Sequence, residues 1–305
     1  MDLIERIGKG RGGFLLFAIT PPRATTAPDR VREITAATIE RLRPIGIDGL
    51  IAYDIDDESS RNPDERPFPF SPTLDPAEYR DAYLGDWTTP VVVYRSVGKY
   101  SPDALAAWIA EQDPSRTLTV FVGAASRHDR NATTLTEAQR ARTEANPDLT
   151  LGGVAIPERH ARRDDEHLRL LDKQASGCRF FVTQVIFDVN AAKNLVSDYF
   201  FECASRGVVP VPIVFTFSVC GSMRTLEFLR WLGVDVPRWV ENDLKHAADT
   251  LEASYHQALA NARDLIAYCD ALGMPYGINV ESVSNRKVEI EASVDLARQL
   301  RAEIT

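Results

Sequence analysis

Polar side chains interrupt an apolar segment in the middle of the chain. Residues 177–189 read GCRFFVTQVIFDV, in which Gln184 and Asp188 come at and beyond the end of a β-branched and aromatic run. Such a run is typical of a strand buried on both faces. Polar groups at the exit of a buried strand indicate a site, and Gln184 and Asp188 are candidate substrate-binding residues.

Other apolar runs also end in residues that could do chemistry. Glu281 ends a run at 276–282, where a carboxylate is costly unless it is paired or functional, so it is a candidate catalytic acid. Tyr94 and Arg95 could hold a carboxylate or phosphate through the guanidinium, with a salt bridge to the acidic loop after the second strand as the alternative. Tyr53 and Phe217 are further candidates, for cofactor and substrate respectively.

Eight such runs alternate with amphipathic segments, and this alternation predicts the fold. Helical patterns cover 29–43, 101–111, 165–175, 191–206, 222–232 and 242–272. Eight strands alternating with helices in 305 residues predict a single (β/α)8 TIM barrel over 1–305, in which functional residues lie at the carboxyl ends of the strands. A doubly wound open sheet is the alternative. The expected strands lie at 14–20, 49–55, 90–96, 118–124, 151–157, 179–187, 209–217 and 276–282.

Residues 54–87 depart from this rhythm. The segment combines five prolines, aromatic residues and an acidic cluster that includes Asp54 and Glu58. We predict a long ordered loop that forms a lid or wall of the site. Asp54 and Glu58 are candidate catalytic acids, and a solvated loop is the alternative for the cluster.

Composition limits the possible partners and compartment. The net charge of −9 argues against nucleic acid as the main partner. No apolar run approaches the length of about 20 residues that crosses a bilayer, and no leader pattern is visible, so we expect a cytoplasmic protein without a membrane partner. The four cysteines are widely spaced, which indicates neither a zinc site nor a disulfide framework.

The densest group of potential metal ligands lies in RHARRDDEH, residues 159–167. Charged residues of this kind more often form the solvated entry of a helix, where Asp164 or Asp165 would cap it. We therefore expect no metal site.

Four motifs in order resemble the methylenetetrahydrofolate reductase family. They are TPPR (20–23), PERH (157–160), TQVIFD (183–188) and LGVDVPRW (232–239). The resemblance implies a barrel that binds a folate over FAD and receives electrons from NAD(P)H. It implies that Gln184 contacts the pterin, whose heteroaromatic edge a carboxamide can match with both a donor and an acceptor. It also implies that His160 and Lys173 hold the adenine-diphosphate part of FAD, with Glu158 and Tyr53 as further cofactor-binding candidates.

The chain departs from the family pattern at several site positions. The family's glutamate before the double proline, its proposed general acid, corresponds to Ala18. A flavin-contacting histidine on the third strand corresponds to Val91, and the folate-stacking aromatic of the seventh loop aligns near Ser222. Residues 123–126 read GAAS where the family has Arg-Gly-Asp. A replacement acid is expected from the acidic cluster after the second strand or from Glu281.

Two functions follow, from different classes. The first is a reductase of one-carbon folate metabolism, an NAD(P)H-dependent oxidoreductase acting on CH-NH groups that reduces 5,10-methylenetetrahydrofolate. The alternative is a diverged barrel that binds folate or another substrate without flavin chemistry: a one-carbon transferase, an enzyme of another pathway, or a non-catalytic partner of an active reductase. A homo-oligomer or a complex with a partner reductase is compatible with either.

Overall fold

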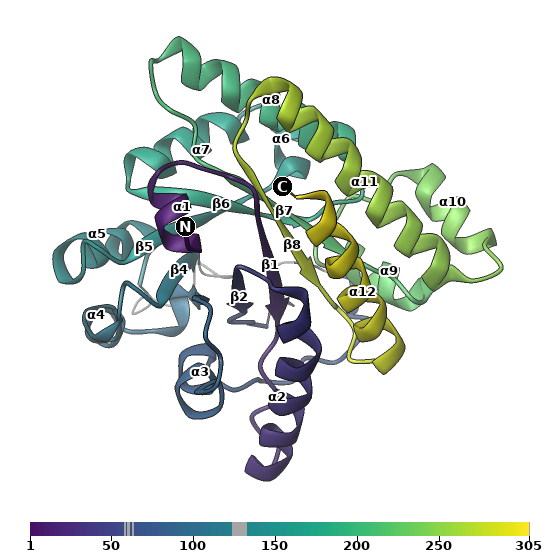
Figure 1. Ribbon diagram of the computed structural model, residues 1–305, viewed down its shortest axis with the longest axis horizontal. Coiled ribbons are helices and arrows are strands. Elements are labelled where there is room, and N and C mark those ends of the chain that lie inside the picture. The colour runs from purple at the N-terminus through teal and green to yellow at the C-terminus, as the bar shows by residue number, and fades with distance from the viewer. Residues whose placement is uncertain (58, 60–61, 63, 124–132, 305) are drawn as a thin grey trace.

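Eight parallel strands close into a barrel in chain order (Figure 1). The computed structural model describes residues 1–57, 59, 62, 64–123 and 133–304. The predicted (β/α)8 barrel is confirmed. The strands are β1 (Phe14–Ile19), β2 (Gly49–Ala52), β3 (Val91–Ser96), β4 (Thr117–Val122), β5 (Thr150–Ala155), β6 (Cys178–Val185), β7 (Ile213–Ser218) and β8 (Tyr276–Glu281).

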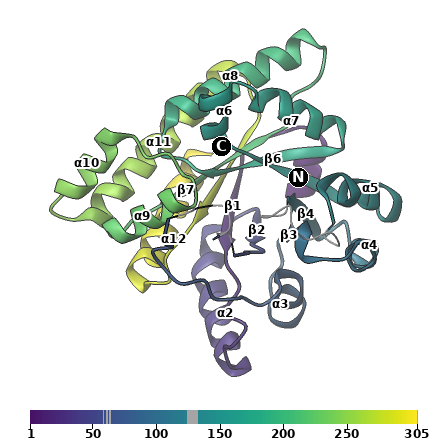
Figure 2. The same cartoon turned by 180° about the vertical axis from the view of Figure 1, so that it is seen from behind.

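Helices surround the strands, and α10 projects from the side of the molecule in both views (Figures 1 and 2). Short 3-10 turns, η1 (Arg43–Ile45) and η3 (Val97–Lys99), follow α2 and β3. The α-helices are α1 (Leu3–Gly8), α2 (Pro28–Leu42), α3 (Pro76–Tyr83), α4 (Pro102–Glu111), α5 (Leu135–Ala145), α6 (Pro157–Arg163), α7 (Glu166–Ala175), α8 (Val189–Ser205), α9 (Met223–Trp231), α10 (Arg238–His246), α11 (Thr250–Leu272) and α12 (Lys287–Glu303).

Local capping explains two differences from the predicted elements. The helix expected over 242–272 is divided into α10 and α11, because Asp249 accepts hydrogen bonds from the amides of Leu251 and Glu252 and starts a new helix. The loop predicted over 54–87 contains α3, so this prediction was wrong for its last third. Asp75 caps α3 and Pro76 occupies its first turn. Glu58 lies outside the described residues.

The amino-terminal end of the barrel is sealed. Leu3 and Ile7 of α1 pack in one cluster with interior residues of the strands, among them Phe14 and Phe180. Small residues make room for these rings, because a Cβ at Gly152 would lie 2.5 Å from the Phe180 ring. The interior is therefore accessible from the carboxyl-terminal mouth, where barrel enzymes place their sites.

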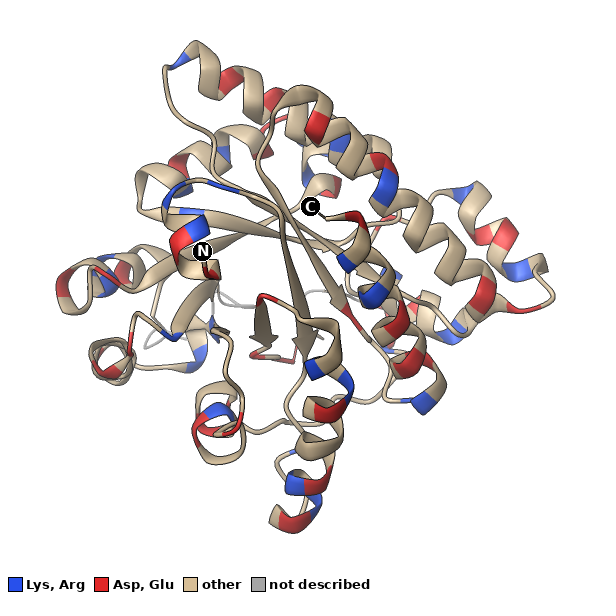
Figure 3. Ribbon diagram, in the orientation of Figure 1, with Lys and Arg blue, Asp and Glu red and all other residues tan. Residues whose placement is uncertain are grey.

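The outer helices carry charges of both signs. Lys and Arg alternate with Asp and Glu along their solvent faces (Figure 3). Within the described ranges, no helix is both long and apolar enough to cross a bilayer.

A buried ionic network anchors the loop after β2 to β3, and it includes two residues that were predicted to belong to the site. Asp54 accepts hydrogen bonds from the Ser96 amide, Lys99 and the Tyr100 hydroxyl. Arg95, only 4 % exposed, pairs with Asp75 and stacks on Trp108 with its guanidinium carbon 4.1 Å from the ring centre. Arg95 points outward, away from the barrel interior.

Asp54 as a catalytic acid and Arg95 as a substrate ligand therefore stay predictions that these contacts do not support. Both carboxylate oxygens of Asp54 accept hydrogen bonds inside the protein. Arg95 forms the salt bridge to the acidic loop that was considered as the alternative, because its partner Asp75 belongs to residues 54–87.

Arg95→Leu should lower the free energy of unfolding by about 3 kcal/mol, because removing one partner leaves the half-buried Asp75 carboxylate without its counter-ion. Denaturant unfolding followed by circular dichroism measures this. Arg32→Leu is the control, since its pair with Asp29 is exposed and should contribute less than about 1 kcal/mol. Equal losses in the two variants would contradict an anchoring role for Arg95.

Candidate functional site

The mouth of the barrel holds a hydrogen-bonded pair made by Tyr53 and Glu281. Tyr53 follows β2, and its hydroxyl donates to Glu281 Oε2 at 2.5 Å. The Tyr53 ring meets Tyr94 of β3 edge to face, with the ring centres 4.9 Å apart. Both Tyr53 and Tyr94 pack against the apolar cluster that fills the barrel interior. The pair therefore sits on the floor of the mouth.

Strand register places Glu281 beside the position of the missing acid. Glu281 pairs with Ala18 of β1 on one side and with Ser218 of β7 on the other. Burial raises the pKa of Glu281 to about 7, and the hydrogen bond from Tyr53 offsets part of this shift. A carboxyl that holds its proton near neutral pH can act as a general acid. Of the acids predicted to replace the glutamate missing at Ala18, Glu281 is the one whose position in the mouth fits best.

An amide with an open acceptor lies next to this pair. Asn279 donates to the Tyr53 hydroxyl at 3.3 Å and to Thr216 Oγ1 at 3.2 Å. Its Oδ1 is buried without a hydrogen-bond partner in the described part of the chain. Buried polar atoms are rarely left without partners, so this oxygen is a place for a ligand donor or a water.

Gln184 reaches the mouth from β6. It lies two residues beyond Val182, which packs in the barrel interior, at a point where the pairing of β6 with β7 becomes irregular. Its Nε2 donates to the carbonyl oxygen of Leu232 at 2.8 Å, in the segment between α9 and α10. This bond holds the carboxamide in one orientation, and among the described residues Oε1 accepts no hydrogen bond.

A second buried carboxyl belongs to Glu158 in the first turn of α6. The residue is 4 % exposed, and burial raises the pKa of its carboxyl to about 7. Asp235 is the nearby acid that adds to this shift. Glu158 thus lies near the segment 232–235 that Gln184 contacts. Its predicted role toward a cofactor stays a prediction.

The residues expected to hold FAD are occupied within the protein. His160 Nε2 lies 2.9 Å from Asp198 of α8. Lys173 donates to the Val154 carbonyl and lies 3.6 Å from Glu166, and burial lowers its pKa against the opposing effect of Glu166. Neither side chain is presented to a diphosphate in this arrangement. His160 and Lys173 as FAD ligands stay predictions that these contacts do not support.

Phe217 is fully buried in the layer between the barrel and its helices, so its substrate role stays a prediction that this placement does not support. Val91, which stands where the family has a flavin-contacting histidine, begins β3 and lies at the sealed end of the barrel. Asp188 caps α8 by accepting from the amides of Asn190 and Ala191, and its substrate role stays a prediction.

Some features of the site were not predicted. The pairing of Tyr53 with Glu281 joins β2 to β8, and only barrel closure brings these residues together. Asn279 itself can be picked out from the sequence, because it lies two residues before Glu281 in the run YGINVES and therefore points to the same side of the strand. The cluster around His160 includes Asp198, which no local spacing indicates.

Comparison with known proteins gives one near relative. No protein-family model matches the chain, and no curated protein matches it. Among solved structures, an uncharacterized protein from Clostridium thermocellum that binds two copies of 5-methyl-5,6,7,8-tetrahydrofolic acid has 41% sequence identity. The match covers 99% of this chain and 99% of that chain, with a TM-score of 0.87.

Two further solved structures are only distantly similar to this chain. A GH10 xylanase from Thermobacillus composti has 13% identity and a TM-score of 0.48, over 92% of this chain and 87% of that chain. The 2,3-dimethylmalate lyase of the PEP mutase/isocitrate lyase superfamily has 11% identity and a TM-score of 0.45, over 99% and 96%.

Glu281→Gln should make the protein more stable at about pH 8 and leave its stability nearly unchanged at about pH 4. The folded protein keeps a proton on Glu281 up to about pH 7, whereas the unfolded chain releases it near the ordinary pKa of 4.5. The wild type therefore loses stability as pH rises between these values, by about 1–2 kcal/mol after allowance for partial exposure.

Denaturant unfolding at the two pH values measures the effect. Glu252→Gln, an exposed carboxyl on α11, is the control and should give the same small difference at both values. A difference for Glu281→Gln that does not change with pH would show that Glu281 does not titrate near neutrality.

Proposed function

The chain belongs to the same family as the Clostridium thermocellum protein, and we propose that it binds a reduced folate at the carboxyl-terminal mouth of its barrel. The proposed ligand is 5-methyltetrahydrofolate or a close tetrahydrofolate derivative. The main structural support for this proposal is two hydrogen-bond acceptors that have no donor among the described residues. They are Asn279 Oδ1 and Gln184 Oε1.

The chemistry of a pterin fits these acceptors. The ring edge of a tetrahydropterin presents several N–H donors and one carbonyl acceptor, so it needs more acceptors than donors from the protein. Asn279 and Gln184 supply acceptors, and Tyr53 and Tyr94 supply an apolar wall against which a ring can pack. A donor-rich heterocycle would satisfy the buried Asn279 oxygen that the protein leaves open.

Reduction of 5,10-methylenetetrahydrofolate is the second candidate function, and the position of Glu281 favours it. The Glu281 carboxyl would give its proton to the amine nitrogen that leaves the methylene carbon. A hydride from NAD(P)H would then add to that carbon, which forms the methyl group of 5-methyltetrahydrofolate and leaves NAD(P)⁺. Under this second proposal, the protein would be a member of the methylenetetrahydrofolate reductase family and would use NAD(P)H.

Neither proposed function requires FAD. The side chains expected to hold its diphosphate, His160 and Lys173, are engaged by Asp198 and by Val154 and Glu166. FAD therefore stays a prediction from the resemblance, and the absorption spectrum of the purified protein with and without added FAD tests it.

Wild-type protein should bind 5-methyltetrahydrofolate saturably in isothermal titration calorimetry. Gln184→Ala should weaken binding by about 1–3 kcal/mol, roughly 5- to 150-fold in Kd, because a buried ligand donor loses its acceptor. Gln299→Ala on the exposed face of α12 is the matched control and should leave Kd unchanged.

The outcomes separate the candidates. Absence of saturable binding by the wild type would overturn the folate proposal, and unchanged affinity in Gln184→Ala would remove that residue from the site. Loss of NADH absorbance that depends on 5,10-methylenetetrahydrofolate, and that Glu281→Gln abolishes, would establish the reductase. Folate binding without this turnover would support a binding protein or a one-carbon transferase.

A further inference from the structure

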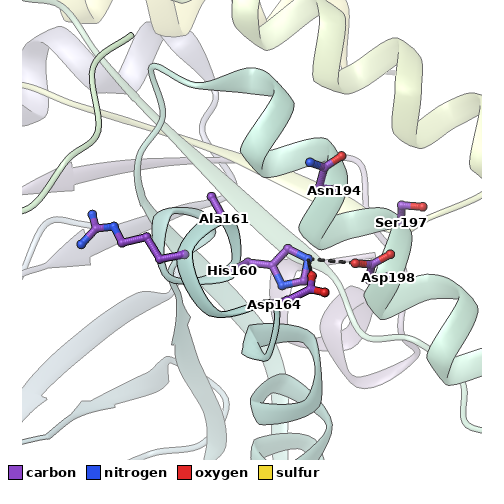
Figure 4. Close-up of a pocket in the computed structure, with 7 residues that line it drawn as sticks. His160, Ala161, Asp164, Asn194, Ser197 and Asp198 are labelled. Carbon is purple, nitrogen blue, oxygen red and sulfur yellow. Dashed lines mark hydrogen bonds and ion pairs between the residues drawn. The ribbon is translucent and has the colours of Figure 1, made fainter.

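Two histidines and an aspartate meet outside the barrel, where α6, α7 and α8 come together. His160 of α6, His167 of α7 and Asp198 of α8 each offer a ligand atom, and these three atoms lie within 4.8 Å of one another. His160 Nε2 is 2.9 Å from Asp198 Oδ2, and the two imidazole rings are edge to face with centres 5.2 Å apart. Figure 4 shows His160 and Asp198 directed toward one another across the gap between α6 and α8.

Ring nitrogens in this cluster lack protein partners. The His160 side chain is 2 % exposed, and its Nδ1 forms no hydrogen bond with any described residue. His167 Nδ1 is likewise buried without a partner in the described ranges. Buried imidazole nitrogens are ordinarily satisfied by a protein group, a water or an ion. Asp198 thus satisfies Nε2 of His160, whereas Nδ1 of each histidine has no partner among the described residues.

The cluster opens onto a cavity of about 270 Å³. Asn194 and Ser197 of α8 line it together with Asp164, whose carboxylate lies 3.7 Å from His160 Nε2. Asp164 ends α6 with a φ of 58°, in the left-handed region that non-glycine residues rarely adopt. A second carboxylate and an entry path are therefore present beside the two imidazoles.

We propose that His160, His167 and Asp198 bind one divalent transition-metal ion, with Zn²⁺ as the best fit. Two imidazoles and one carboxylate are a ligand set that Zn²⁺ uses when a fourth position stays open. Ca²⁺ and Mg²⁺ take oxygen ligands and fit this set poorly. The adjoining cavity would leave room for a water at the fourth position, and the Asp164 carboxylate is near enough to serve there instead.

The geometry needs only local adjustment. Ligands at about 2.1 Å from a tetrahedral Zn²⁺ lie about 3.4 Å from one another. The present separations of up to 4.8 Å exceed this by little more than 1 Å, which rotations of the side chains can supply. Nε2 of His160 would exchange its hydrogen bond to Asp198 for a bond to the ion that both residues share. The ion would thereby tie α6, α7 and α8 together.

The site is separate from the mouth. None of its ligands belongs to the group of Tyr53, Gln184, Asn279 and Glu281, and all three come from helices and not from the strands of the barrel. Metal binding and folate binding can therefore be tested independently of each other.

Chelator-treated wild-type protein should bind one Zn²⁺ per chain in competition with a chromophoric chelator. Its Co²⁺ form should show the visible absorption of a low-symmetry site. Asp198→Asn and His167→Gln should each weaken Zn²⁺ binding by at least about tenfold, since loss of groups around a metal commonly costs 10- to 100-fold. His256→Gln, an exposed imidazole beside Glu252 on α11, is the matched control and should bind as the wild type does.

Thermal unfolding gives a second readout. Zn²⁺ should raise the melting temperature of the wild type and of His256→Gln, and it should not raise that of Asp198→Asn combined with His167→Gln. These two positions are used because His160 is buried and its replacement could prevent folding. Absence of stoichiometric Zn²⁺ and Co²⁺ binding by the wild type, or equal affinities in wild type, Asp198→Asn and His167→Gln, would overturn the proposal whatever the result for folate.

Discussion

Closure of the eight strands sends consecutive side chains of each strand to opposite sides of the barrel wall, and the place of each polar residue follows from this alternation. Asn279 faces the interior because Ile278 and Val280 on either side of it pack beneath the helices. The same parity turns Phe217 outward. Since α1 seals the other end, an inward polar side chain near a strand's carboxyl end can meet a ligand only at the mouth.

Buried carboxyls serve two different purposes in this molecule. Asp54 is surrounded by donors, including Lys99 and the Ser96 amide, and it anchors the loop after β2. Glu281 has the Tyr53 hydroxyl as its donor and no cation beside it among the described residues. A buried carboxyl without a counter-ion keeps its proton to higher pH, because desolvation disfavours its charged form. The neighbours of each carboxyl, more than its depth, therefore distinguish the ion-paired Asp54 from Glu281, whose pKa is raised.

Much of the fold could be predicted, and the limits have physical causes. The strands were visible because they are buried on both faces and read as continuous apolar runs, as at residues 179–187. That same property hides the direction of each side chain, which is why Arg95 and Phe217 were assigned to the mouth although they point outward. The helix α3 was missed because its cap, Asp75 with Pro76, lies within a segment whose proline and acid content is typical of loops.

The site was harder to predict because its contacts join distant parts of the chain. Gln184 and Glu281 could be singled out, since each is a polar residue at the end of an apolar run. The bond from Tyr53 to Glu281 and the contact of His160 with Asp198 could not, because they depend on barrel closure and on helix packing. Periodicity within a segment carries no information about either.

The carboxyl at the mouth lies on the strand next to the one on which the resemblance leads us to expect an acid. Ala18 occupies the position where the resemblance implies a glutamate, and Glu281 is its direct partner on the adjacent strand. Neighbouring strands lie about 4.8 Å apart, a distance that a glutamate side chain can span. Because β1 and β8 meet only where the barrel closes, this contact joins the two ends of the chain. A group that is missing from one strand can therefore be supplied at the same level of the barrel by the strand beside it.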